Sequence, residues 1–230
     1  QKAPGMFFYF EARAEFIDRE LARAFTQIPC AIQIGLQSAD PEILRYVHRS
    51  LDKKKFVKNI KLLNEEGAVF GFDLIYGLPK DTLEGFKKSL DFALELYPNN
   101  VETFCLSVLP GTALYETAAS LGAVFSRIPP YNVIKTDAFS EKDLQKAKEL
   151  STACTIFYND GRAVPWFNAV CRYFHMRPSQ FLADFYRWYK ERAMENSAEC
   201  RAHTAIEKMQ IDFICEKLSV RKDSAISKPV

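Results

Sequence analysis

Short apolar runs alternate with longer amphipathic segments along the first half of the chain. Apolar runs without strict alternation are typical of buried strands, and apolar residues spaced three and four apart are typical of helices. The pattern predicts four strands, at Met6–Glu11, Ala31–Leu36, Ala68–Ile75 and Val101–Val108. It predicts helices at Phe16–Thr26, 41–48, 53–66, Leu83–Leu96 and 113–121. Strand–helix alternation with connections of this length indicates a parallel sheet.

The pattern changes near Ser126, and from Ser140 onward it is helical. The segment Ile128-Pro129-Pro130-Tyr131 is predicted to be a stiff, extended linker, because a residue before proline disfavours helix. Helices are expected at 140–161, Pro165–Phe174, Pro178–Met194 and Ala198–Leu218. The predicted fold class is α/β: a partial (β/α) TIM-type barrel with about four parallel strands, followed by an all-helical C-terminal extension. The expected boundaries are 1–127 for the barrel part, 128–222 for the helical domain and 223–230 for a flexible tail.

Composition narrows the possible functions. The 230 residues carry a net charge of +2, so nothing indicates nucleic-acid binding, and no apolar run approaches the ~20 residues of a membrane span. The six cysteines include no closely spaced pair, so no metal site is predicted, and reduced thiols in a cytoplasmic protein are expected. Residue 1 is Gln and no signal peptide follows, so we expect a piece of a longer protein.

Four polar residues stand where predicted elements end. Glu11, Gln37 and Asp73 lie at the ends of strands, and Arg49 ends the helix after the second strand. In parallel α/β folds the carboxyl ends of strands form the ligand-binding edge. Carboxylates can hold ribose hydroxyls or an ammonium group, and a guanidinium binds a carboxylate. The set therefore suits a zwitterionic ligand with a sugar. Alternatively, Glu11 or Asp73 pairs with Arg49 and merely closes the rim.

Two segments, in this order, resemble radical S-adenosylmethionine (SAM) enzymes. Ile34-Gly35-Leu36-Gln37-Ser38, with Arg49 downstream, looks like the fourth barrel strand of that family, and Asp73-Leu74-Ile75-Tyr76-Gly77-Leu78-Pro79 looks like the fifth. The resemblance is to the branch with an N-terminal cobalamin-binding domain, which includes magnesium-protoporphyrin IX monomethyl ester oxidative cyclases. The second segment is also similar to oxygen-independent coproporphyrinogen III oxidase. The match runs from about Met6 to Tyr131.

The resemblance implies a role for each residue that matches the family's motifs. Glu11 is expected to contact the amino group and ribose of SAM. Gln37 and Arg49 are expected to orient its methionyl part, with Arg49 binding the carboxylate. Asp73 resembles the ribose ligand, and Ile75 resembles the apolar contact to adenine.

One departure from the family pattern shapes the functional expectation. Radical SAM enzymes hold a [4Fe-4S] cluster through C-x-x-x-C-x-x-C, and this chain has no such triplet. The resemblance therefore implies that the cluster ligands, the first two strands and any cobalamin domain lie outside this chain. The parent is expected to be an oxidative-cyclase-like oxidoreductase that uses 5′-deoxyadenosyl radical chemistry on a small-molecule substrate. This part alone is expected to be inactive, with no catalytic residue of its own.

Other interpretations remain open from the sequence. The parent could be a radical SAM methyltransferase or a coproporphyrinogen oxidase-like enzyme, or the chain could be a non-catalytic barrel-derived binding scaffold. An aldolase-type barrel with Asp73 or Glu11 as a base is a third possibility, although no lysine lies inside a predicted strand. If the chain lacks the first two strands of the barrel, the backbone edge of Met6–Glu11 is exposed, which predicts self-association through that edge or its coverage by the helical tail.

Overall fold

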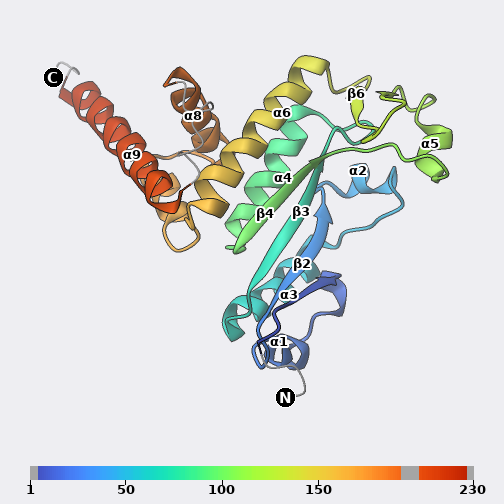
Figure 1. Ribbon diagram of the computed structural model, residues 1–230, viewed down its shortest axis with the longest axis horizontal. Coiled ribbons are helices and arrows are strands. Elements are labelled where there is room, and N and C mark those ends of the chain that lie inside the picture. Colours follow the sequence, from blue (N-terminus) through green and yellow to red (C-terminus); the bar gives the residue numbers. More distant parts are fainter. Residues whose placement is uncertain (1–4, 193–201, 227–230) are drawn as a thin grey trace.

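The computed structural model describes residues 5–192 and 202–226, with side chains up to residue 220 (Figure 1). Its centre is a sheet of four parallel strands in the order β1-β2-β3-β4. The strands are β1 (Phe8–Ala12), β2 (Cys30–Gln37), β3 (Phe70–Tyr76) and β4 (Asn100–Cys105). Each lies within about three residues of its predicted position, and the predicted α/β class with about four parallel strands is confirmed.

Helices connect consecutive strands and begin at side-chain caps. The connections are η1 (Ala14–Phe16) and α1 (Arg19–Phe25), then α2 (Pro41–Arg45) and α3 (Lys53–Glu66), then α4 (Leu83–Glu95). The side chains of Asp18, Asp52 and Thr82 each accept a hydrogen bond from a backbone N–H in the first turn of α1, α3 and α4. Helix α3 ends at Gly67, which adopts a left-handed φ of 75°. Its predicted bounds, 53–66, are confirmed.

The two faces of the sheet differ in chemistry. In β2, buried residues alternate with half-buried ones, so Ile32, Ile34 and Leu36 pack into the core while Gln33, Gly35 and Gln37 point to the opposite face. In β3 the same division sets Phe70, Phe72 and Leu74 against Gly71, Asp73 and Ile75. Helices cover the apolar face (Figure 1). The polar face is therefore the one available to a ligand.

The segment at 128–131 differs from the predicted extended linker. It joins β5 (Val124–Phe125) to β6 (Val133–Lys135), which pair antiparallel, after the short helix α5 (Ala113–Thr117). The Pro129–Pro130 peptide bond is cis, Tyr131 has a left-handed φ of 59°, and the Tyr131 N–H donates to the Ile128 carbonyl at 2.9 Å. The extended-linker prediction is wrong, because the hydrogen bond and the left-handed backbone of Tyr131 close a turn that the proline pattern does not specify.

From Ser140 onward the described residues are helical, as predicted. Helix α6 (Glu141–Ala153) runs directly into a π-helix, η2 (Cys154–Asp160), and ends at Gly161. Helices α7 (Phe167–Tyr173), α8 (Pro178–Glu191) and α9 (His203–Ile226) follow. The predicted start of the last helix, Ala198, lies outside the described residues, and α9 extends beyond the predicted end at Leu218. The predicted domain boundaries, including the 223–230 tail, stay predictions.

The helical tail packs on the sheet through one continuous hydrophobic core. Phe157 in η2 is the centre of a buried aromatic cluster that also contains Phe181, Phe185 and Phe213. The aromatic side chains spaced along α8 therefore pack into the core. No helix in the described part of the chain combines the length and the apolar character that crossing a membrane would need.

Candidate functional site

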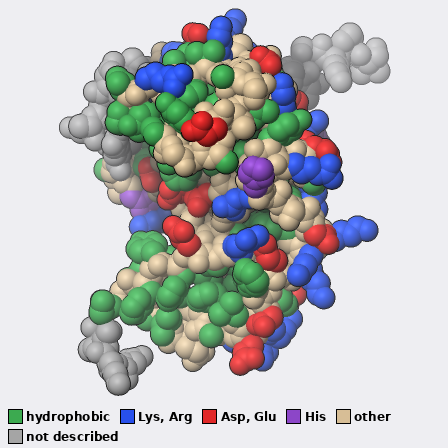
Figure 2. All heavy atoms as spheres, turned by 90° about the vertical axis from the view of Figure 1, so that its right-hand side faces the viewer, with side chains coloured by type: hydrophobic (Ala, Val, Ile, Leu, Met, Phe, Trp, Pro, Cys, Tyr) green, Lys and Arg blue, Asp and Glu red, His purple; other side chains and the backbone are tan. Residues whose placement is uncertain are grey.

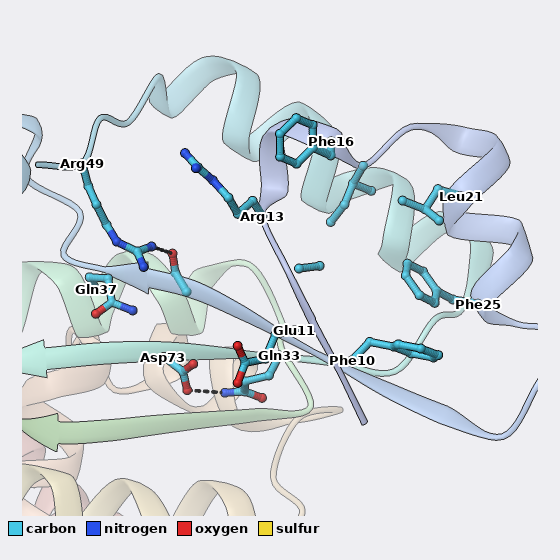
Figure 3. Close-up of a pocket in the computed structure, with 13 residues that line it drawn as sticks. Phe10, Glu11, Arg13, Phe16, Leu21, Phe25, Gln33, Gln37, Arg49 and Asp73 are labelled. Atoms are coloured by element: carbon cyan, nitrogen blue, oxygen red, sulfur yellow. Dashed lines mark hydrogen bonds between the residues drawn. The ribbon is translucent and has the colours of Figure 1, made fainter. Parts of the chain in front are cut away.

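A cavity of about 590 Å³ opens on the polar face of the sheet beside β1 (Figure 3). Glu11, Gln37, Arg49 and Asp73 all line it. The structure therefore brings four of the five predicted site residues together, from β1, β2, β3 and the loop after α2. The fifth, Ile75, is half-buried on β3, two residues beyond Asp73 on the same face, and is outside this lining.

Gln37 is held at the end of β2 by an irregular backbone. The pairing of β2 with β3 shifts between Gly35 and Gln37, and Gln37 adopts a left-handed φ of 65°. The next N–H, of Ser38, donates to the Leu36 carbonyl at 2.8 Å, which closes a tight turn. A bulge re-aims the side chain that follows it, and a left-handed non-glycine residue is an uncommon conformation that concentrates at binding sites.

Arg49 reaches the sheet through the turn that ends α2. His48 adopts a left-handed φ of 54°, and the Arg49 N–H donates to the Leu44 carbonyl at 2.9 Å. The Arg49 Nη1 then donates to the Gly35 carbonyl at 3.4 Å. A Cβ at Gly35 would lie 3.3 Å from this Nη1 and 3.1 Å from the Gln37 Nε2. Glycine at position 35 therefore gives the guanidinium and the amide room to approach the strand.

Asp73 has a partner that the sequence pattern did not single out. The Gln33 Nε2 donates to the Asp73 Oδ1 at 2.7 Å (Figure 3). Burial raises the pKa of Asp73 above its usual value; the Gln33 hydrogen bond lowers it, the Glu11 charge raises it and Arg49 lowers it. Asp73 therefore responds to the charges of both Glu11 and Arg49, as expected of groups that share one pocket. The alternation along β2 places Gln33 on the same face as Gln37, but it does not show which neighbouring side chain Gln33 contacts.

The alternative in which a salt bridge closes the rim has no support here. Among the described residues, Arg49 makes no ion pair within 4.0 Å with Glu11 or Asp73. Its hydrogen bond goes to a backbone carbonyl instead, so the guanidinium and both carboxylates keep hydrogen-bonding capacity for a ligand.

The donor set and the space fit SAM. A cavity of about 590 Å³ lies in the ordinary range for small-molecule and cofactor pockets. Two carboxylates suit an ammonium group and ribose hydroxyls, and a guanidinium beside an amide suits a carboxylate. The clearance at Gly35 leaves the Gln37 amide and the Arg49 guanidinium close to the strand.

The part of the chain that the structure describes contains no group of side chains arranged to bind an iron–sulfur cluster. No group of three or more His, Cys, Asp or Glu side chains gathers there in an arrangement that could hold a metal ion. Cys30, Cys154 and Cys171 are buried, and burial raises the pKa of each thiol, which disfavours the thiolate that binds metal. That the cluster ligands lie outside this chain stays a prediction.

Two family models match different parts of the chain. Residues 1–93 match the Radical SAM superfamily, and residues 119–226 match a family described as a protein of unknown function, DUF4080. The first match contains all five predicted site residues, Glu11, Gln37, Arg49, Asp73 and Ile75. The second contains the hairpin β5–β6 and the helical tail.

Similar proteins include one curated relative and two solved structures. The oxygen-independent coproporphyrinogen III oxidase of Helicobacter pylori (strain J99) is 35% identical over 80 residues, which are 34% of this chain and 18% of the relative. The cobalamin- and [4Fe-4S]-bound radical SAM methyltransferase TsrM from Kitasatospora setae is 17% identical, with a TM-score of 0.44, over 57% of this chain and 28% of that one. Coproporphyrinogen III oxidase from Escherichia coli is 22% identical, with a TM-score of 0.41, over 62% of this chain and 38% of that one.

These matches cover only part of each protein. The chain spans less than a fifth of the length of the curated relative. The match to the Radical SAM superfamily covers residues 1–93 of the 230.

Proposed function

We propose that this chain supplies the SAM-binding side of a radical SAM enzyme. The observation that carries the proposal is the convergence of Glu11, Gln37, Arg49 and Asp73 on one pocket of the polar sheet face. Arg49 binds the methionyl carboxylate and Gln37 orients it from the left-handed turn. Glu11 takes the ammonium group and ribose, and Asp73 takes a ribose hydroxyl. Ile75, next on the same face of β3, packs against adenine.

When bound, SAM supplies radical chemistry that acts on carbon–hydrogen bonds, together with a [4Fe-4S] cluster held elsewhere in the parent protein. The residues of this chain bind SAM and fix its orientation, which is the contribution a protein makes to cofactor chemistry. Under this proposal the chain binds SAM but does not cleave it alone. A small-molecule substrate, a cobalamin domain in the parent and a cytoplasmic location belong to the same proposal.

Among the activities considered, the relatives favour the coproporphyrinogen oxidase-like alternative over the oxidative cyclase. The curated relative reported above is named for the oxidase reaction, and the cyclase reading gains no support. We therefore propose an oxidase-like activity for the parent protein. Product analysis of the reconstituted parent, under reducing and anaerobic conditions, distinguishes oxidative decarboxylation from ring formation.

SAM binding to this chain tests the site directly. Equilibrium dialysis with radiolabelled SAM would compare the wild type with Arg49→Met, which keeps the length of the side chain and removes the charge. We expect affinity to fall about 10- to 100-fold, since a hydrogen bond to a charged group contributes about 1.5–3 kcal/mol.

The matched control is Arg45→Met. Arg45 lies on α2, pairs with Glu42 at 2.9 Å, and is exposed and outside the pocket. Its replacement should leave SAM affinity within about twofold of the wild type, because an exposed ion pair contributes little. Equal losses in both variants, or no measurable binding by the wild type, would contradict the proposed function.

A further inference from the structure

Gln33 lies between two carboxylates on the polar face of the sheet. It is the register partner of Glu11 on β1 and of Gly71 on β3, and Asp73 lies two residues beyond Gly71. Its Nε2 donates to the Asp73 Oδ1 at 2.7 Å, and it lines the same pocket. The amide therefore bridges β2 to β3 within the site.

Gly71 makes this placement of Gln33 possible. A Cβ at residue 71 would lie 2.6 Å from the Gln33 Oε1, and closer still to the Asn100 Oδ1. Such contacts do not occur for real side chains, so a larger residue at position 71 would displace both amides. The Gln33 amide thus occupies the space that a side chain at residue 71 would fill.

The hydrogen bond divides the two oxygens of Asp73. Oδ1 accepts from Gln33, while Oδ2 has no hydrogen-bond partner among the described residues. Asp73 is half-buried and lines the pocket, so Oδ2 is the oxygen left for a ligand. An amide donor at Oδ1 also favours the ionised carboxylate, which is the form that accepts a hydrogen bond from a hydroxyl.

We propose that Gln33 is a positioning residue, which holds Oδ1 of Asp73 so that Oδ2 accepts a hydrogen bond from one ribose hydroxyl of SAM. The inference rests on the proposed function and adds to it a residue outside the expected ligand set. It implies that Asp73 binds the ribose through a single oxygen.

The charges around Asp73 set the direction of the pH effect. Glu11 faces it from β1, Glu102 is its register partner on β4, and Arg49 approaches from the loop after α2. Without the Gln33 donor, burial and the Glu11 charge still raise the Asp73 pKa, and only Arg49 is left to lower it. Because SAM needs the ionised carboxylate, the pH below which binding is lost should then move upward.

The experiment uses two variants of almost unchanged side-chain size. Gln33→Leu removes the donor, and Gln33→Glu replaces it with a second carboxylate. The titration of Asp73 is followed by ¹³C NMR of the aspartate-labelled chain without SAM, with Asp73→Asn to assign the signal. SAM affinity is measured by dialysis across the same pH range. Gln27→Leu is the control, since the Gln27 side chain is exposed and, among the described residues, its Nε2 donates a hydrogen bond to the neighbouring Thr26 Oγ1 at 3.4 Å.

We expect the Asp73 titration to move to higher pH in Gln33→Leu, and further in Gln33→Glu. SAM affinity at neutral pH should fall about three- to tenfold in Gln33→Leu. The pH at which half of the SAM binding is lost should move together with the Asp73 titration seen by NMR. The Gln27→Leu control should match the wild type in both measurements.

The two readouts separate the inference from the proposed function. Both variants keep the approximate size of the Gln33 side chain and change only its hydrogen-bonding group. An unchanged Asp73 titration in both would therefore show that Gln33 only fills space, and would overturn the inference. If the titration moves but the wild type binds no SAM, the proposed function fails and the ribose assignment fails with it. If the titration moves and SAM affinity does not, Asp73 is not the ribose ligand and the inference is again overturned.

Discussion

Asp81 is buried at the turn between β3 and α4, and burial raises its pKa to about 6. Its Oδ1 accepts from the Thr82 N–H at 2.7 Å, but its Oδ2 has no hydrogen-bond partner in the described part of the chain. A carboxylate without full hydrogen bonding is costly to bury in its charged form. Asp40 adds a further negative charge nearby.

Replacing Asp81 with Asn should change how stability depends on pH. The folded protein binds the proton of the Asp81 carboxyl more tightly than the unfolded chain does. The stabilisation from this protonation is therefore full below about pH 4 and is lost as pH rises to about 6. The difference in unfolding free energy, Asp81→Asn minus wild type, should increase by roughly 2–3 kcal/mol between pH 4 and pH 7. Urea unfolding at several pH values measures it.

A surface aspartate provides the comparison for this variant. Asp52 caps α3, is exposed, and accepts from the Lys55 N–H at 3.1 Å. Asp52→Asn removes a negative charge while keeping an oxygen acceptor, so it tests for a general effect of charge. A difference between Asp81→Asn and wild type that stays constant from pH 4 to pH 7 would argue against a buried, raised Asp81.

At the scale of single residues, position within elements predicted which side chains line the pocket. Glu11 and Gln37 lie at or next to the last residue of β1 and β2, where a parallel sheet has its ligand-binding edge. The placement of Asp73 at a strand end is wrong, because Asp73 lies in the middle of β3 and reaches the pocket through the polar face of the sheet. Gln33 could not be assigned in this way. Its role depends on the register that places β2 beside β3, and on the missing side chain at Gly71, neither of which a linear pattern contains.

At the scale of elements, β4 shows how a sheet edge is closed. The Asn159 side chain in η2 bonds to both backbone groups of Val101, accepting from its N–H at 2.9 Å and donating to its carbonyl at 3.0 Å. The amide therefore replaces a neighbouring strand at this point. Nearby, the Tyr158 hydroxyl donates to the Pro98 carbonyl at 2.7 Å. Covering an edge in this way prevents it from pairing with another chain.

Asn159→Ala should weaken this closure. Loss of the two bonds should lower the free energy of unfolding by about 1–3 kcal/mol and speed hydrogen exchange at the Val101 amide. Asn64→Ala is the matched control, since Asn64 donates one exposed bond, to the Leu96 carbonyl at 2.9 Å. Its loss should be smaller and should leave Val101 exchange unchanged. Equal stability losses with no change at Val101 would refute the closure of the β4 edge.

Element prediction succeeded where local signals agreed and failed where a turn needed unusual backbone. Helix α3 has a cap at Asp52, an apolar stripe and Gly67 at its end, and its predicted bounds matched. The turn between β5 and β6 contains Tyr131 in a left-handed conformation, which a sequence pattern does not mark. The strands it joins, of two and three residues, are also too short to give a periodic signal.

At the scale of the whole molecule, the two edges of the sheet are unequal. The β4 edge is covered by η2, while β1 is the last strand of the described sheet on its other side. Tyr9 on β1 is 82% exposed, and Met6 and Phe7 just before it are more than half exposed. Figure 2 shows hydrophobic side chains gathered at the lower part of one face. An open strand edge beside exposed apolar side chains is a surface that binds another strand.

Self-association through β1 should depend on the backbone of Tyr9. The Phe8 N–H donates to the Pro29 carbonyl at 2.9 Å, so the backbone N–H of residue 8 points toward β2. Because successive N–H groups of a strand point to opposite sides, the N–H of residue 9 points away from the sheet. Tyr9→Pro removes that donor and places a ring on the open edge. We expect sedimentation equilibrium to show a concentration-dependent dimer for the wild type and about tenfold weaker association for Tyr9→Pro, a change of about 1.4 kcal/mol.

The control for this prediction is Tyr9→Ala, which removes the same aromatic ring but keeps the N–H. If strand pairing drives association, Tyr9→Ala should retain more of the dimer than Tyr9→Pro, because only proline removes the outward donor. If the exposed ring drives it instead, both variants should lose association equally. A wild-type chain that stays monomeric at every concentration would show that the open edge of β1 does not recruit a second copy.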